Sequence, residues 1–194
     1  MARTAEFNRE EVLQKAMDTF WEGGYCKSSM SRLVSATHLQ PGSIYAAFNS
    51  KEGLFLAALE YYGQQSVEKL QNCLNQANTS LNGVKNFIEM IGEGILSRKQ
   101  QPGCFLVNTV LEISPGKTAI NQEVNKHLKA IESHLFSALV SAHEAGELPP
   151  NKDPKVLAKY LMTNIWGLQV LAKTNPDKAS VRAILDQILA SLQT

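Results

Sequence analysis

The stretch PGSIYAAFNSKEGL, residues 41–54, decides how the N-terminal part of the chain folds. Pro41 suits the first turn of a helix, because its missing N–H group would have no intrahelical partner there. Ile44 and Phe48 are four residues apart, so both side chains lie on one face of that helix and can enter a core. Asn49 ends the helix, and Ser50 can cap the next one, which begins at residue 51. The stretch therefore predicts a short helix, a tight break and the start of a second helix.

Two further helices are predicted upstream of this stretch. Apolar residues recur at helical spacing over residues 12–20, and Asn8 begins a capping-box pattern just before them. Gly23-Gly24 ends this helix. A short helix follows, with Ser28 or Ser29 as its N-cap. Together with residues 41–48 these segments predict a three-helix unit that contains a helix-turn-helix.

The rest of the chain predicts more helices and no clear strand. Apolar stripes at helical spacing mark a long helix from residue 51 to about 76 and, at the end, helices over about 155–173 and 177–192. We expect about nine helices in all, so the fold class is all-α. We predict an N-terminal helix-turn-helix domain over residues 1–51 and a C-terminal helical bundle domain over residues 52–194.

The charges of the 194-residue chain are unevenly placed. With 19 basic and 18 acidic residues the net charge is +1, which excludes a bulk polycation of the histone kind. Residues 23–51, however, hold three basic and no acidic residues, whereas residues 1–22 hold three basic and five acidic ones. A surface that meets phosphate gains by excluding carboxylates, so this segment is a candidate for nucleic-acid contact. Chance in a Ser-rich stretch is the alternative.

Other classes of protein find little support in the sequence. No run of 18 apolar residues predicts a membrane span, and the N-terminus lacks the apolar core of a signal peptide. Cys26, Cys73 and Cys104 are too few and too widely spaced for a disulfide framework or a zinc site. We find no phosphate-binding loop, dinucleotide fingerprint, metalloprotease motif or catalytic triad. We therefore expect a cytoplasmic protein that is not an enzyme, does not associate with membranes and holds no cofactor or metal.

Residues 42–54 match the pattern G-x-I/L-Y-x-x-F-x-x-K-E-x-L, and on them the chain resembles the TetR family of transcriptional regulators. The resemblance covers roughly residues 8–56. It implies a ligand-responsive regulator, in the usual case a repressor, that binds a palindromic double-stranded DNA operator as a homodimer and is released by a small-molecule effector. Two residues depart from the family pattern. His38 stands where members often carry glycine, although histidine tolerates left-handed backbone, and Pro41 stands where many carry a basic residue.

The resemblance also suggests which residues meet DNA. Gln40 and Ser43 lie at the N-terminal end of the recognition helix, where side chains reach base edges or phosphate. Tyr45 can offer its hydroxyl to a phosphate, and the methyl group of Ala46 can touch a thymine methyl. The full set of candidate DNA-binding residues is Ser28, Ser29, Gln40, Ser43, Tyr45, Ala46 and Lys51.

A polar stripe in the C-terminal part suggests an effector pocket. Residues 104, 108 and 112 share one face of an otherwise apolar helix, and they resemble the G-C-x-x-x-N-x-x-x-E segment of one branch of the family. We expect Asn108 and Glu112 to line or brace the pocket, with a solvated or interhelical hydrogen-bonding stripe as the alternative. The other candidates, for which ordinary core packing is the alternative where they are apolar, are Tyr61, Phe87, Ile91, Cys104, Phe105, His127, Met162, Trp166 and Gln169.

The last two helices are implied by the resemblance to form a four-helix bundle with a second copy of the chain. The expected interface residues are Leu161, Ile165, Leu168, Val181, Ile184, Ile188 and Leu192. The alternative is that these stripes form the core of one protomer, and the same stripes can serve both uses.

Two alternatives to a ligand-responsive regulator remain open from the sequence. Cys104 follows Gly103 at a predicted helix N-terminus, where the helix dipole lowers the pKa of a thiol, so the chain could sense oxidants or electrophiles. The second alternative is an all-α adaptor without DNA binding, in the case that His38 and Pro41 disable the helix-turn-helix.

Overall fold

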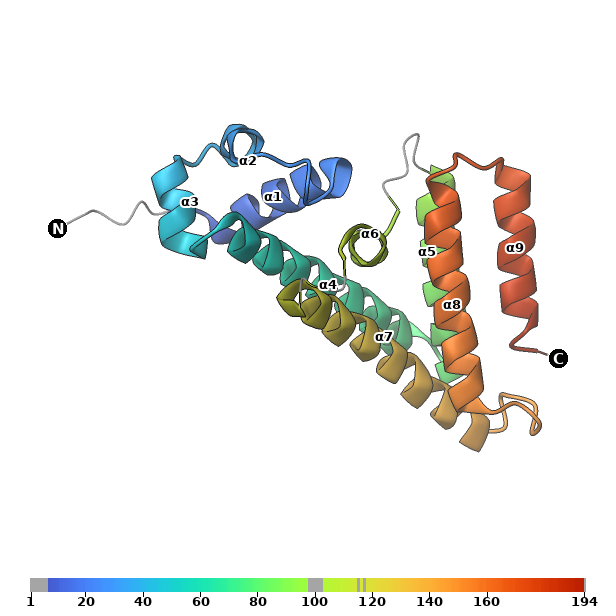
Figure 1. Ribbon diagram of the computed structural model, residues 1–194. Helices are drawn as coiled ribbons and strands as arrows, with labels where there is room; N and C mark the ends of the chain where they lie inside the picture. Colours follow the sequence, from blue (N-terminus) through green and yellow to red (C-terminus); the bar gives the residue numbers. More distant parts are fainter. Residues whose placement is uncertain (1–6, 98–102, 115, 117, 194) are drawn as a thin grey trace.

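The computed structural model describes residues 7–97, 103–114, 116 and 118–193, and over these ranges it consists of nine helices without a strand (Figure 1). The predicted all-α class is therefore confirmed. None of these helices is long and apolar enough to span a membrane. In chain order they are α1 (Arg9–Gly23), α2 (Met30–Thr37), α3 (Pro41–Phe48), α4 (Lys51–Gln76), α5 (Ser80–Ser97), α6 (Phe105–Glu112), α7 (Thr118–Glu144), α8 (Pro154–Ala172) and α9 (Lys178–Ala190).

Short polar residues begin the N-terminal helices as the sequence predicts. The side chain of Asn8 accepts hydrogen bonds from the first turn of α1, and Ser29 and Ser50 cap α2 and α4 in the same way. His38 follows α2 with φ 58° and ψ 18°, which is the left-handed conformation that this turn requires. The turn between α2 and α3 is thus intact without glycine.

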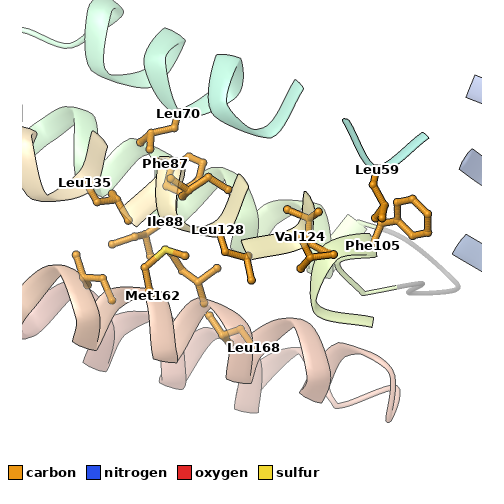
Figure 2. Packing of buried hydrophobic residues seen from close by; sticks show 14 of the residues in the cluster. Leu59, Leu70, Phe87, Ile88, Phe105, Val124, Leu128, Leu135, Met162 and Leu168 are labelled. Carbon is orange, nitrogen blue, oxygen red and sulfur yellow. The ribbon is translucent and has the colours of Figure 1, made fainter. Parts of the chain in front are cut away.

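The first three helices form a head at one end of the molecule, and α4 runs from this head into the body (Figure 1). In the body α4 packs along α7 and α5, while α8 and α9 cover the other side of α5. α6 is a short helix that lies between the head and the pair α5 and α8. Buried side chains from α4, α5, α7 and α8, among them Leu70, Ile88, Leu128 and Met162, fill the space between these helices (Figure 2).

An aromatic cluster joins the head to the body. Phe55 of α4 packs edge-on against Phe20 of α1, with ring centroids 4.8 Å apart, and against Phe105 of α6 at 5.5 Å. Trp21 and Tyr62 extend the same cluster, with centroids 5.1 Å apart. The start of α4 is thus packed into the head. The domain division after residue 51 remains a prediction.

Candidate DNA-binding face and effector cavity

One face of α3 is exposed and free of bulky packing. Ile44 and Phe48 point into the core of the head, whereas Gly42, Tyr45 and Ala46 are exposed, Tyr45 at 49%. A Cβ atom at Gly42 would meet nothing within 4 Å. This face can therefore enter the major groove of DNA without steric hindrance.

Polar residues surround this face at the ends of the helices. Gln40 is the N-cap residue of α3, and its exposed side chain makes no capping hydrogen bond. Ser29 is exposed at the start of α2, where its hydroxyl accepts a hydrogen bond from the N–H group of Arg32. Ser43 is half-buried in the first turn of α3. The side chains of Gln40 and Ser29 are thus placed to reach an external ligand.

Two cations lie over aromatic rings of the head. The Nζ atom of Lys51 is 4.5 Å from the ring centroid of Tyr25, and the guanidinium carbon of Arg9 is 4.9 Å from that of Phe48. Phe48 is the last residue of α3, so Arg9 adds positive charge beside the recognition helix. Sequence reasoning missed Arg9 because it belongs to the acidic first segment, and only the fold of the head brings its side chain over the ring of Phe48.

The position of Ser28 contradicts the expectation that this residue contacts DNA. Its side chain is fully buried, and its hydroxyl donates to the backbone carbonyl oxygens of Gly24, at 2.6 Å, and Thr19, at 3.3 Å. The hydroxyl ties the end of α1 to the loop before α2 and does not point outward. Ser28 therefore supports the head and is not a candidate for contact with DNA.

A cavity of about 290 Å³ lies between α1, α4, α5, α6, α7 and α8. Six residues of the predicted pocket line it, namely Phe87, Ile91, Cys104, Met162, Trp166 and Gln169. The structure adds a wall that the sequence did not indicate, formed by Gln14, Met17 and Trp21 of α1. All three lie within residues 1–51, the predicted helix-turn-helix domain, and no local pattern marks this side of α1 as part of a cavity.

The described wall of the cavity is apolar and aromatic, with a few polar groups. The amide side chains are those of Gln14, Gln65 and Gln169, and Lys69 is the single charged residue among the described lining residues. No carboxylate is present in that part of the wall. Such a lining suits a molecule with an apolar body and a neutral or negatively charged polar end.

The thiol of Cys104 differs from the sequence-based expectation. It lies at the N-cap of α6, and the N–H groups of Leu106 and Val107 together with the hydroxyl of Tyr62 favour the thiolate. Burial outweighs these contacts and raises the pKa of the Cys104 thiol, although the residue is partly accessible from the cavity. The expectation of a lowered pKa is therefore wrong, and a thiol sensor loses its main physical support.

Three predicted pocket residues lie outside the cavity wall because they pack elsewhere. The hydroxyl of Tyr61 donates to Oε1 of Glu10 at 3.3 Å on the surface of α1. Phe105 is buried in the aromatic cluster described above. His127 is buried between α4 and α7, and its Nε2 atom is 2.8 Å from Oε1 of Glu123. All three stabilise the framework around the cavity.

Apart from Cys104, the residues of the polar stripe on α6 also lie outside the cavity wall. The side-chain oxygen of Asn108 accepts a hydrogen bond from Nζ of Lys173 at 3.2 Å, which links α6 to the end of α8. The carboxylate of Glu112 accepts hydrogen bonds from the N–H groups of Tyr25, at 2.9 Å, and Cys26, at 2.8 Å. Neither residue lines the cavity: Asn108 makes an interhelical hydrogen bond, and Glu112 binds the loop between α1 and α2.

The residues expected at a dimer interface are mostly used inside the protomer. Ile184 is half-buried, and the other six are buried, namely Leu161, Ile165, Leu168, Val181, Ile188 and Leu192. The six buried residues hold α8 and α9 against the body, so their side chains are not available to a partner, whereas a contact of Ile184 with a partner remains a prediction. The outer face of α8 instead exposes Val156, Tyr160 and Val170, which lie along one side of the helix.

Comparisons with known proteins agree with this architecture. Residues 12–58 match the model of bacterial regulatory proteins of the tetR family, and residues 80–188 match the tetracyclin repressor-like C-terminal domain. The chain is 31% identical over 172 residues to the transcriptional repressor ComR of Escherichia coli, covering 88% of this chain and 82% of ComR. It is 22% identical over 193 residues to the repressor DhaR of Mycobacterium sp., covering 99% and 94% of the two chains.

A solved structure shows the same fold together with a nucleic acid. It is a cysteine mutant of the TetR family regulator CifR in complex with a 26-base-pair operator DNA, and it is 29% identical to this chain. The two structures superimpose with a TM-score of 0.86 over 98% of each chain. The match of both the N-terminal and the C-terminal family models confirms what residues 42–54 suggest. The chain belongs to the TetR family of bacterial transcriptional regulators, and it is a regulator and not an enzyme.

Proposed function

We propose that the chain is a cytoplasmic transcriptional repressor that binds a palindromic operator as a homodimer and releases it when a small molecule enters the cavity. The observation that carries this proposal is the exposed face of α3, which lies in the acid-free segment of residues 23–51. His38 holds the turn before α3 in a left-handed conformation, so the helix-turn-helix is complete and an adaptor without DNA binding is disfavoured.

The residues of this face and those at the nearby helix ends have defined roles in this proposal. Gln40 and Ser43 contact base edges or phosphate at the N-terminal end of α3, and the methyl group of Ala46 contacts a thymine methyl. Tyr45 and Ser29 donate to phosphate oxygens, and Lys51 adds a cation beside them, assisted by the N-terminus of α4. These contacts position the protein and read a few bases in each half-site.

Selection of DNA from a random library with the purified protein tests the proposal. We expect a palindrome whose half-site centres are roughly one helical turn apart. Tyr45→Ala should weaken binding of the selected DNA about tenfold, and Lys51→Ala should lower the slope of log K against log salt by about one per protomer. Phe136→Ala, which removes an exposed aromatic ring on α7, serves as the control and should leave the Kd unchanged. Recovery of no specific sequence would refute the proposal.

The dimer interface in this proposal is the outer face of α8, with Val156, Tyr160 and Val170 packing against a second copy. Placing a charge in an apolar interface without a partner is costly, so Tyr160→Glu should give a monomer. Sedimentation velocity measures this directly, and Phe136→Glu on α7 is the matched control that should remain dimeric. A Tyr160→Glu protein that still sediments as a dimer would place the interface elsewhere.

The effector in this proposal is an apolar, preferably aromatic, molecule that is neutral or anionic. The described cavity wall has Lys69 and three amides but no carboxylate, so a cationic ligand would lose its hydration without gaining an ion pair. The matched probes 2-naphthoate and 2-naphthylmethylammonium differ chiefly in the sign of their charge. We expect naphthoate to raise the melting temperature more than the ammonium compound. The reverse order would contradict the proposed ligand class.

A further inference from the structure

Glu112 makes a contact that neither the DNA-binding face nor the cavity explains. Its two carboxylate oxygens accept hydrogen bonds from consecutive N–H groups, those of Tyr25 and Cys26, at 2.9 and 2.8 Å. The preceding residue, Gly24, has φ +76°, and a Cβ atom there would lie 2.8 Å from both oxygens. The glycine therefore permits the close approach, and the loop between α1 and α2 forms a site for one carboxylate.

This contact is a second attachment of the head to the body. The head is joined covalently to the body through α4, with the aromatic cluster around Phe55 packed at that junction. Glu112 holds the loop that leads from α1 into α2, and α2 leads directly into the recognition helix α3. The aromatic cluster already packs Trp21 of α1 against Phe105 of α6, and the Glu112 contact adds an attachment at the loop that leads toward the recognition helix.

The same short helix forms part of the cavity wall. Cys104, the N-cap of α6, and Val107 in its first turn line the cavity, and Glu112 is its last residue. An eight-residue helix is about 12 Å long. The cavity wall and the carboxylate that holds the head thus lie at the two ends of one short helix.

We propose that Glu112 is a positioning residue, which fixes the orientation of the head for operator binding. The proposal rests on the proposed function, because it concerns the spacing of two heads on one operator. Half-sites lie roughly 34–36 Å apart, so a small rotation of each head moves the recognition helices out of register. Glu112 itself touches no DNA in this scheme.

The test compares Glu112→Ala and Glu112→Gln with the wild-type protein. Glutamine keeps one acceptor oxygen, so it retains one of the two hydrogen bonds, whereas alanine retains neither. Glu147→Gln is the matched control, because Oε2 of Glu147 also accepts a hydrogen bond from a backbone N–H, that of Leu81 at 2.9 Å, far from the head. The readouts are the Kd for the selected operator and the hydrogen exchange of the Tyr25 and Cys26 amides.

The sign of the effect separates positioning from simple electrostatics. Removing a carboxylate near DNA strengthens binding through charge alone, whereas loss of positioning weakens it. Couplings between sites commonly amount to about 5- to 150-fold, and we expect about tenfold weaker operator binding for Glu112→Ala and a smaller loss for Glu112→Gln. Exchange of both amides should accelerate in Glu112→Ala and exchange of one amide in Glu112→Gln, and the salt slope should not change because no phosphate contact is lost.

The possible results separate this inference from the proposed function. A wild-type protein that selects no DNA overturns the proposed function itself. Glu112 variants that lose amide protection but keep the wild-type Kd overturn the inference alone. An equal loss of affinity in Glu147→Gln also overturns it, because the effect would then report general stability and not the position of the head.

Discussion

Replacing Gly24 with alanine should destabilise the protein by an amount that depends on Glu112. Gly24 has φ +76°, a conformation that alanine adopts only with strain, and the added Cβ would lie 2.8 Å from both carboxylate oxygens of Glu112. Gly146, which follows α7, has φ +73°, but a Cβ there would meet nothing within 4 Å. Gly146→Ala thus replaces a glycine of positive φ without creating a collision.

The expected free-energy changes follow from these contacts. Backbone strain at a positive φ costs about 1–3 kcal/mol in either variant. Gly24→Ala also displaces the carboxylate and breaks two hydrogen bonds, each worth about 0.5–1.5 kcal/mol, with the lower values applying because the site is exposed to solvent. The collision with Glu112 should therefore add about 1–2 kcal/mol at Gly24, and this part should vanish when Glu112 is replaced by alanine.

A double-mutant cycle measures this term. The free energies of unfolding of wild type, Gly24→Ala, Glu112→Ala and the double variant are obtained from urea titrations followed by circular dichroism. All four are measured at one protein concentration, because dimerisation contributes to apparent stability. If Gly24→Ala costs the same within about 0.5 kcal/mol in both backgrounds, the carboxylate is not held at the loop and the reasoning is refuted.

Two further predictions concern buried contacts of the body. In Gly63→Ala the new Cβ would collide with the ring of His127, so we expect the free energy of unfolding to fall by about 1–3 kcal/mol, less about 1 kcal/mol gained from the higher helix propensity of alanine. Urea unfolding measures this change, and the additional substitution His127→Ala should relieve it. A more stable Gly63→Ala variant would contradict the packing. Because burial raises the pKa of the Cys104 thiol, less thiolate exists at a given pH, and alkylation by iodoacetamide should be slower than at exposed Cys26 and should accelerate only at higher pH. Tyr62→Phe should shift that pH dependence further upward by removing a donor to the thiolate, and an unchanged profile would exclude the hydrogen bond.

Local features of the head could be predicted from the sequence because they depend on near neighbours. Ser50 caps α4 through the N–H group of Gly53, three residues away, and Pro41 occupies the first turn of α3. His38 takes up the left-handed conformation within a turn of a few residues. Such contacts are fixed by residue type and spacing, so the pattern over residues 38–54 is enough to indicate them.

Contacts between distant segments could not be predicted in the same way. The apolar stripes of α8 and α9 indicate helices, but the sequence does not show whether Leu161 packs within the protomer or against a partner. Glu112 and Tyr25 are 87 residues apart, and only the placement of α6 beside the loop joins them. Trp21 likewise reaches the cavity because α1 lies across it. The polar stripe on α6 indicated that Cys104, Asn108 and Glu112 face polar surroundings, but it did not indicate which residues they contact.

The wall that α1 contributes to the cavity has a consequence for how this regulator can diverge. Val12 and Phe20 of α1 pack in the core of the head, while Gln14 and Trp21 of the same helix line the cavity. A substitution that adapts α1 to a new inducer therefore also disturbs the operator-reading unit. Selection for altered inducer range should accumulate changes in α5 and α8, where residues such as Ile91 and Trp166 line the cavity. Substitutions in α1 should instead give variants whose target genes are expressed constitutively or cannot be induced.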